Sequence, residues 1–261
     1  MMIRFFVQIE YDGSAYHGFQ IQNNTKKTIQ HHLNSALSKV ANHKVTTICS
    51  GRTDAGVHAI NQFIHFDTKS KRNIDSWVKG VNSYLPEDIK VKNFYRVDSD
   101  MHARFSAKSR SYVYLIKNCA TPPALGAKNC LWVRKALNVD KMNKAAKHLI
   151  GEKDFSAFRA SGCQSNSPIR EIFEANILKK GSYIFFKIKG NAFMLNMVRI
   201  IMGTLINVGT DKMNITDFKE IIKQKRRKGA GKTISANGLY FLGPEYNELT
   251  YTKEAFLNEL D

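Results

Sequence analysis

The chain has 261 residues, and its 40 Lys and Arg residues exceed its 22 Asp and Glu residues, which gives a formal net charge of +18. Hydrophobic residues make up 43% of the sequence and aromatic residues 11%, which is typical of a folded globular protein and excludes a disordered chain. The most apolar stretch, residues 190–210, is interrupted by Arg199 and by asparagines, so it does not supply the roughly 18 apolar residues that a membrane helix needs. The first ten residues include Arg4, Gln8 and Glu10 and lack the apolar core of a signal peptide. We therefore expect neither a secreted nor a membrane protein.

The positive charge favours a polyanionic partner. A surplus of this size gives the surface a positive field that attracts nucleic acid and that salt weakens. The four cysteines, Cys49, Cys119, Cys130 and Cys163, are far apart and form no C-x-x-C pair, which argues against a zinc ribbon or a disulfide framework. Free cysteines fit a reducing compartment, so we expect a cytoplasmic protein.

The first half of the chain predicts the order strand, helix, strand, strand, helix, strand. Alternating apolar residues predict a strand over 3–11, and Tyr11-Asp12-Gly13-Ser14 predicts a turn. Apolar residues at helical spacing after Thr28, a suitable N-cap, predict the first helix. The other elements are strands over 45–49 and 62–66 around a Gly-rich turn, a helix capped by Asp75 and carrying Val78 and Val81, and a strand over 89–97 marked by Ile89, Val91, Asn93, Tyr95 and Val97.

The second half predicts a similar cycle. Its expected elements are a strand over 111–117, a helix capped by Asp140, strands over 170–178 and 182–189, an apolar helix over 193–208, a helix capped by Thr216 and a short strand over 239–242. We therefore predict an α+β protein of two ferredoxin-like, RNA-recognition-like α/β halves, each with an antiparallel sheet flanked by helices. The boundary is expected near residues 105–109, which gives an N-terminal domain over 1–105 and a C-terminal domain over 106–261.

The segment Gly51-Arg52-Thr53-Asp54-Ala55-Gly56-Val57-His58-Ala59 is the strongest candidate for chemistry. Glycines at both ends allow a sharp turn and the close approach of a ligand, and Arg52 would keep the Asp54 carboxylate ionised. An ordinary turn, in which Asp54 caps its own backbone, is equally compatible with the spacing. His58 and His65 lack partners at the spacing of a metal site, so no metal is expected.

Three other segments carry basic residues that could contact an anion. Residues 102–114 mix Arg and Lys with Phe and Tyr, which suits unpaired nucleotides but also suits a strand whose tyrosines pack in a sheet. Residues 223–232 form either a solvated helix end or a phosphate clamp. They do not form a nucleotide-triphosphate loop, because Arg226 occupies the position of its first glycine. Arg199 lies within an apolar helix and therefore requires a partner or a bound anion, with Asp54 a natural candidate.

Several motifs, in order, resemble the tRNA pseudouridine synthase A family over nearly the whole chain. They are 51–58; Tyr11-Asp12-Gly13 with Tyr16, Gly18 and Gln20; 102–107; Cys163-Gln164-Ser165 with Ser167, Pro168 and Arg170; Asn191-Ala192-Phe193 with Met197-Val198-Arg199; and Gly238-Leu239-Tyr240. Two departures are Phe19, where the family usually has Trp, and Leu195-Asn196, where a His pair is common.

The resemblance implies a tRNA pseudouridine synthase that isomerises uridine at positions 38–40 of the tRNA anticodon stem-loop, without cofactor or metal. It also implies a homodimer and an active-site cleft between the two halves. The family's catalytic aspartate corresponds to Asp54, and its arginine partner to Arg199. Arg52 corresponds to the arginine that binds substrate, Tyr112 to the tyrosine that stacks on the target base, and Leu239 to an apolar wall of the pocket.

This isomerisation needs one ionised carboxylate and a pocket that excludes water. If water entered after the glycosidic bond broke, the cleaved base would be lost from the site. The sequence leaves open whether Asp54 attacks C1′, attacks the base or removes the 2′ proton. It also leaves open which of the three uridines is preferred and what the loop over 121–129 does. Two rival classes are an RNA-binding protein without catalysis and a nucleosidase that releases uracil.

Overall fold

A computed structural model describes residues 2–251, and the fold divides into two units. Unit 1 comprises residues 2–110 and 241–251, and unit 2 comprises residues 111–240. The chain therefore returns to unit 1 near its end, which the sequence did not predict. The assignment of separate functional roles to residues 1–105 and 106–261 stays a prediction.

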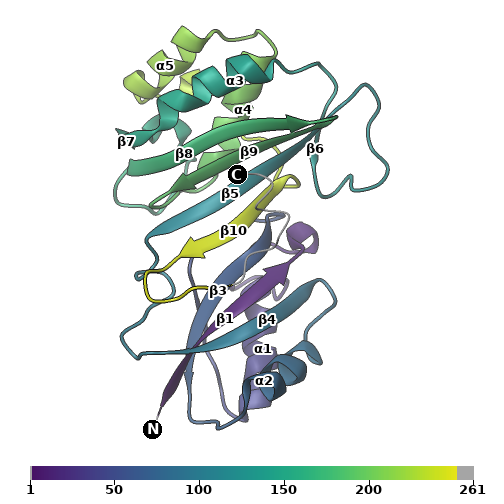
Figure 1. The fold of residues 1–261 in the computed structure, drawn as a ribbon, viewed down its shortest axis with the longest axis vertical. Coiled ribbons are helices and arrows are strands. Elements are labelled where there is room, and N and C mark those ends of the chain that lie inside the picture. Colours follow the sequence, from purple (N-terminus) through teal and green to yellow (C-terminus); the bar gives the residue numbers. More distant parts are fainter. Residues whose placement is uncertain (1, 252–261) are drawn as a thin grey trace. The chain divides into compact units, whose positions relative to one another are not determined.

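Unit 1 has the predicted ferredoxin-like topology. Strand β1 (Ile3–Tyr11) pairs in antiparallel register with β3 (His58–Thr68) and with β4 (Ile89–Val97), and the strand order is β4-β1-β3-β10, with β2 (Ile48–Cys49) also beside β3. Strand β10 (Leu239–Glu245) enters unit 1 at Phe241. Figure 1 shows α1 (Ile29–Ala41) and α2 (Ile74–Asn82) together on one side of these strands.

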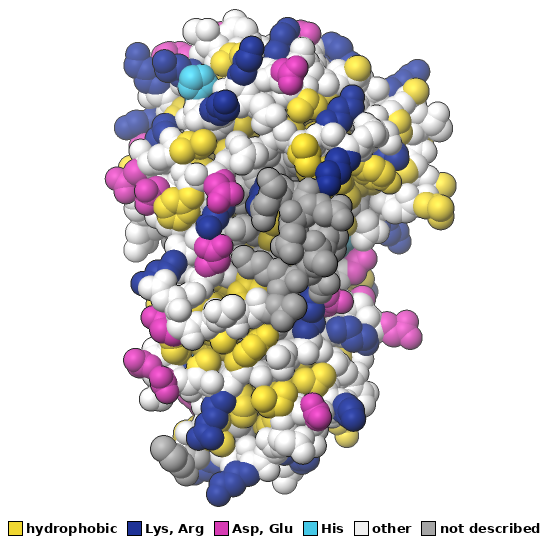
Figure 2. Space-filling model, viewed as in Figure 1, with side chains coloured by type: hydrophobic (Ala, Val, Ile, Leu, Met, Phe, Trp, Pro, Cys, Tyr) yellow, Lys and Arg dark blue, Asp and Glu magenta, His cyan; other side chains and the backbone are white. Residues whose placement is uncertain are grey.

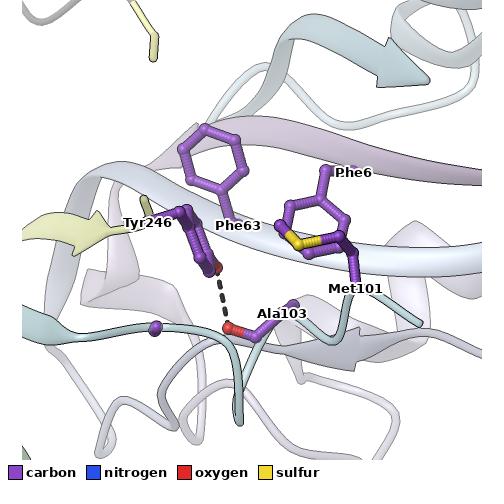
Figure 3. Packing of buried hydrophobic residues seen from close by; sticks show 6 residues of the cluster. Phe6, Phe63, Met101, Ala103 and Tyr246 are labelled. Atoms are coloured by element: carbon purple, nitrogen blue, oxygen red, sulfur yellow. Dashed lines mark hydrogen bonds between the residues drawn. The ribbon is translucent and has the colours of Figure 1, made fainter. Parts of the chain in front are cut away.

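Both faces of this sheet are buried. On the helix side, the ring of Trp77 on α2 packs 5.9 Å from Phe5 and 5.4 Å from Phe94. The opposite face carries a second apolar cluster, which we call the Phe6 cluster; its buried members are Phe6, Phe63, Met101, Ala103, Ala107 and Tyr246 (Figure 3). The alternation of β1 indicated only one buried face, because a single strand does not show what the later segments 101–107 and 241–251 cover.

A bulge in β4 changes which of its residues face the helices. Gln8 pairs with Asn93 while Ile9 pairs with Val91, so one extra residue, Lys92, shifts the alternation. As a result, Phe94 is buried among the rings of the helix side, whereas Tyr95 packs against the Phe6 cluster. The simple alternation expected along 89–97 is wrong beyond Val91.

Unit 2 repeats the order strand, helix, strand, strand, helix. Its strands β5 (Ser109–Asn118), β9 (Tyr183–Gly190), β8 (Ile169–Lys180) and β7 (Gly151–Asp154) lie side by side in that order, and the short β6 (Leu131–Val133) pairs with β5. Its helices are α3 (Val139–Ala146), α4 (Met197–Gly209) and α5 (Ile215–Gln224). Helix α3 contacts β8, α4 and α5. Single 3-10 turns occupy Gly13–Ala15, Lys147–Leu149, Ser156–Phe158 and Arg227–Gly229, and β6 and β7 are too short to have left a sequence pattern.

Three of the predicted helix caps are wrong. Asn73, Asn138 and Asn214 accept the capping hydrogen bonds of α2, α3 and α5, in place of Asp75, Asp140 and Thr216. Asp75 and Asp140 lie instead in the first turn, where a negative charge is favourable to the helix dipole. Thr28 caps α1 as predicted, through a hydrogen bond from the His31 amide.

Several element boundaries also differ from the prediction: β3 and β10 are longer than expected, and two other elements are shorter. The strand expected over 45–49 is reduced to β2, because the amides of Val45 and Thr47 bond to the side chains of Ser38 and Asn34 on α1. Helix α4 begins at Met197 rather than at residue 193, after Asn196 with a left-handed φ of 58°.

Within residues 2–251 no helix is long and apolar enough to cross a membrane. On the face drawn in Figure 2, Lys and Arg side chains are dispersed among Asp and Glu and do not gather in one patch.

His65 on β3 makes unit 1 sensitive to acid. Its ring is buried, and burial lowers its pKa to about 4, with the charges of His102 and Arg4 acting in the same direction. The unfolded chain therefore binds the His65 proton from about pH 6.5 downward, whereas the folded chain binds it only near pH 4. This contribution to stability is complete above pH 6.5 and is lost as the pH falls toward 4.

We predict that the free energy of unfolding falls between pH 7.5 and pH 5 by about 1–2 kcal/mol more in the native chain than in His65→Gln. Urea unfolding at the two pH values measures the difference, and His17→Gln, at an exposed histidine, is the control. An equal pH dependence in the native chain and in His65→Gln would contradict the prediction.

Candidate active site

Residues 50–57 form the loop between β2 and β3 in unit 1, and we call them the Asp54 loop. Asp54 is half-buried and Arg52 is exposed. A turn closes the loop, with the Val57 amide donating to the Asp54 carbonyl at 3.2 Å and Gly56 in a left-handed conformation with φ of 78°. The loop thus holds the carboxylate beside a central strand of its unit.

Side chains from β1 and β3 hold the loop through hydrogen bonds. The hydroxyl groups of Tyr11 and Thr53 are 2.8 Å apart and hydrogen bonded. Gln62 donates from Nε2 to the carbonyl of Gly51 at 2.7 Å and accepts from the hydroxyl of Ser50 at 2.7 Å. Because Tyr11 is buried, its pKa is raised, so the phenol stays neutral and serves as a fixed hydrogen-bonding group.

The segment after β1, residues 12–19, also packs against the loop, through backbone contacts that only glycine permits. A Cβ on Gly13 would lie 2.0 Å from the Val57 carbonyl oxygen, and one on Gly18 would lie 2.9 Å from the Thr53 carbonyl oxygen. Gly18 also has a φ of +97°. The Phe19 amide donates to the same Thr53 carbonyl at 3.0 Å. These contacts explain why Gly13 and Gly18 accompany the Asp54 loop.

His58 and Cys49 flank the loop: the His58 ring contacts Gly13 and Asp12, and the Cys49 thiol is not activated. Nδ1 of His58 lies 3.3 Å from the Gly13 amide and 3.1 Å from Oδ1 of Asp12. Burial raises the pKa of Cys49 to about 11, although the charges of Arg52 and Arg104 oppose it, so the thiol stays protonated near neutral pH. Among residues 2–251 no group of three or more His, Cys, Asp or Glu side chains is arranged to hold a metal ion.

Unit 2 carries the other predicted site residues. Tyr112 on β5 is buried, and its ring meets the ring of Phe193 edge to face at a centroid distance of 5.2 Å and an angle of 80°. Leu239, the first residue of β10, is also buried, and its amide donates to the carbonyl of Ala236 at 2.8 Å. Both side chains are therefore buried, and their roles as a stacking tyrosine and an apolar wall stay predictions.

Arg199 lies in the first turn of α4, where the positive end of the helix dipole disfavours a cation. Two hydrogen bonds hold it there: Nε donates to the Ile234 carbonyl at 2.7 Å, and Nη1 donates to Oδ1 of Asn196 at 2.6 Å. Asn196 therefore helps to orient Arg199. A guanidinium added to a helix N-terminus creates a strongly positive point, which suits an anion.

The structure thus groups the predicted residues by unit: Asp54 and Arg52 share one loop of unit 1, while Tyr112, Arg199 and Leu239 belong to unit 2. The sequence missed the supporting residues Gln62 and Arg110. Arg110 donates to the Ser50 carbonyl at 3.1 Å, at the start of the Asp54 loop. A glutamine alternating with apolar residues, and an arginine at a strand start, have no distinctive pattern.

Comparison with known proteins identifies the class. A family model described as tRNA pseudouridine synthase matches residues 7–106 and 145–247. A protein named tRNA pseudouridine synthase A from Francisella philomiragia subsp. philomiragia is 43% identical over 252 residues, which cover 97% of each chain. The protein of the same name from Francisella tularensis subsp. novicida is 42% identical over 253 residues, which cover 97% of this chain and 98% of that one.

Among solved structures, a crystal structure of the archaeal box H/ACA sRNP Nop10-Cbf5 complex matches 86% of this chain and 59% of that chain, with 12% identity and a TM-score of 0.37. That likeness is too distant to support an argument. The sequence matches nevertheless define the class, an isomerase that acts on tRNA. The chain belongs to the tRNA pseudouridine synthase family, which confirms the family predicted from its motifs.

The close approach at Gly18 leads to a prediction. Gly18→Ala places a methyl group against the Thr53 carbonyl, displaces the Asp54 loop and lowers kcat for pseudouridine formation by at least tenfold. Gly126→Ala is the matched control, because Gly126 also has a positive φ, +70°, but has no atom within 4 Å of the added Cβ. Equal kcat values for the two variants, measured on unmodified tRNA, would disprove the positioning role of Gly18.

Proposed function

We propose that this protein converts uridine to pseudouridine at positions 38–40 of the tRNA anticodon stem-loop, with Asp54 as the essential carboxylate. The single observation that carries the proposal is that the Asp54 loop is held in place, by hydrogen bonds from Gln62 and Tyr11 and by close backbone packing at Gly13 and Gly18. Family membership supports the substrate class. The resemblance supplies the positions in the tRNA.

A single fixed carboxylate suits this isomerisation. The N1–C1′ bond of uridine must break, the base must turn within the site, and C5 must then bond to C1′. Breaking the first bond develops positive charge on the sugar, which an ionised Asp54 stabilises or traps as a covalent bond. Hydrolytic glycosidases typically use a pair of carboxylates and admit water to the site. The isomerisation adds no water, so the proposal requires no second carboxylate.

The other site residues receive roles that fit their surroundings. We assign Tyr112 to stacking on the target base and Leu239 to an apolar wall that excludes water, since both are buried apolar surfaces in unit 2. Exposed Arg52 is assigned to the RNA backbone, and Arg199 to an anion. The pairing of Arg199 with the Asp54 carboxylate stays a prediction, for which a double-mutant cycle on kcat is the test.

Replacing the carboxylate isolates its chemical role. We predict that Asp54→Asn abolishes pseudouridine formation while the affinity for tRNA falls less than tenfold, about 1.4 kcal/mol, because the amide keeps the size of the side chain. Asp98→Asn, at an exposed aspartate of unit 1, is the control with full activity expected. Carbodiimide labelling and primer extension on unmodified tRNA map the product.

Three outcomes of that assay separate the proposal from its rivals. Pseudouridine at 38–40 with the native chain and none with Asp54→Asn supports the proposal. Tight binding without pseudouridine from either protein would favour an RNA-binding protein, in which Asp54 is a turn residue. Release of free uracil would indicate a nucleosidase.

The stacking role of Tyr112 depends on its ring rather than its hydroxyl group. We predict that Tyr112→Phe keeps kcat within about threefold of the native value, while Tyr112→Leu loses tenfold or more, because stacking on a base contributes roughly 1–3 kcal/mol. Single-turnover rates at saturating enzyme measure both. Equal losses in the two variants would contradict stacking.

We further propose that the protein acts as a homodimer in the cytoplasm, as the resemblance implies. The absence of C-x-x-C pairs among four separated cysteines supports a reducing compartment. Light scattering of the purified protein tests the dimer, and a monomer at micromolar concentration would contradict it. Fractionation of cells tests the compartment.

A further inference from the structure

Residues 102–106 form a surface turn of unit 1 that presents Phe105 to solvent. Phe105 is 75% exposed, which is unusual for a phenylalanine. One neighbour, the ring of His102, stacks on it at a centroid distance of 4.4 Å and an angle of 29°. Another, the guanidinium of Arg104, lies 5.4 Å from the ring centroid. The proposed function assigns no role to these residues.

Hydrogen bonds within the turn fix its backbone and the His102 ring. Nδ1 of His102 accepts from the amides of Arg104 and Phe105, both at 3.1 Å. The His102 amide donates to the Ser106 hydroxyl and the Ser106 amide donates to the His102 carbonyl, both at 2.9 Å. The turn is therefore ordered before any ligand binds, which reduces the entropy cost of binding.

The turn is anchored on the buried Phe6 cluster. Ala103 is fully buried in that cluster, and its carbonyl accepts a hydrogen bond of 2.7 Å from the Tyr246 hydroxyl (Figure 3). The Ala103 amide donates to Nδ1 of His65 at 3.1 Å. Anchoring at Ala103 leaves the next two residues, Arg104 and Phe105, on the surface with a fixed orientation.

Arg110 connects this turn to the Asp54 loop within the same unit. Its guanidinium donates to the carbonyl oxygens of Ser50, at 3.1 Å, Ala107, at 3.0 Å, and Arg104. Both Arg104 and Arg52 are close enough to Cys49 for their charges to act on its pKa. The turn and the Asp54 loop are thus neighbours, and Arg110 is hydrogen bonded to both.

We propose that Phe105 and Arg104 form a subsite for an unpaired nucleotide of the RNA substrate, beside the Asp54 loop. The ring of Phe105 stacks on the base, and the Arg104 guanidinium binds the adjoining phosphate. Arg110 is the positioning residue that keeps this subsite at a fixed distance from Asp54. This inference rests on the proposed function in taking RNA as the substrate.

Charge and ring chemistry favour a nucleotide as the occupant. The chain has a net charge of +18. Arg104 in the turn, Lys108 just after it and Arg52 on the adjoining Asp54 loop are exposed, so a polyanion is attracted there. An aromatic ring with a cation beside it is the usual platform for a base in single-stranded RNA. Tyr84, two residues after the end of α2, is 54% exposed, and Nζ of Lys39 on α1 lies 4.7 Å from its ring centroid. Because this is also an exposed ring with a cation beside it, Tyr84 serves as a matched control.

Binding of an unmodified anticodon stem-loop RNA, followed by fluorescence anisotropy, tests the subsite directly. Phe105→Leu should weaken binding and raise KM roughly tenfold while kcat at saturation stays within about twofold. Phe105→Trp should retain affinity, and its added indole fluorescence should be quenched when the RNA binds. Tyr84→Leu should leave affinity and KM unchanged. Arg104→Gln should reduce the slope of log K against log salt by about 1.

The outcomes separate this inference from the proposed function. Native affinity for Phe105→Leu, with pseudouridine still formed, would overturn the subsite and leave the function intact. Weaker binding by Phe105→Leu, with no pseudouridine from the native chain, would overturn the function and leave an RNA-binding subsite. An equal loss in Phe105→Leu and Tyr84→Leu would mean that exposed rings act nonspecifically, and the subsite would again be overturned.

Discussion

The close packing of two backbone segments, residues 12–19 and the Asp54 loop, is the constraint on which the rest of the candidate site depends. Gly13 and Gly18 allow carbonyl oxygens of the loop to come within a distance that any side chain would block. Gln62 also donates to the Gly51 carbonyl of the loop, and Tyr11 is hydrogen bonded to the Thr53 side chain, so both the backbone and a side chain of the loop are held. A carboxylate on such a loop needs little rearrangement when charge develops beside it.

Burial keeps titratable groups beside the Asp54 loop neutral near physiological pH. Burial raises the pKa values of both Tyr11 and Cys49, so neither loses its proton near neutral pH. His65, further along β3, is also neutral above its lowered pKa. These neutral groups support the backbone through hydrogen bonds and packing, and they leave the chemistry to Asp54 and the cations.

The positive charge has a broad and a local meaning. On the face drawn in Figure 2, Lys and Arg are dispersed among acidic residues. A net charge of +18 attracts a polyanion at long range wherever the cations lie. Local recognition requires cations that are held in position. Arg199 is held by Asn196 and the Ile234 carbonyl, and Arg104 lies in a turn anchored at Ala103. In the segment 102–114, which the sequence left between two interpretations, Phe105 is exposed, whereas Tyr112 and Tyr114 are buried.

The sequence by itself determined the family, the ferredoxin-like order of elements and the candidate residues, because periodicity and motifs are local properties of the chain. Only the tertiary structure decided which groups support the loop, since Gly13, Gln62 and Arg110 act through contacts with residues 44, 11 and 60 positions away along the chain. It also decided the helix caps, the bulge at Lys92 and the return of residues 241–251 to unit 1. The bulge and the return of residues 241–251 depend on pairing and packing between distant segments, which no local pattern records. The helix caps are local: Asn73, Asn138 and Asn214 each accept from an amide three residues later, and the structure chose them over neighbouring candidates.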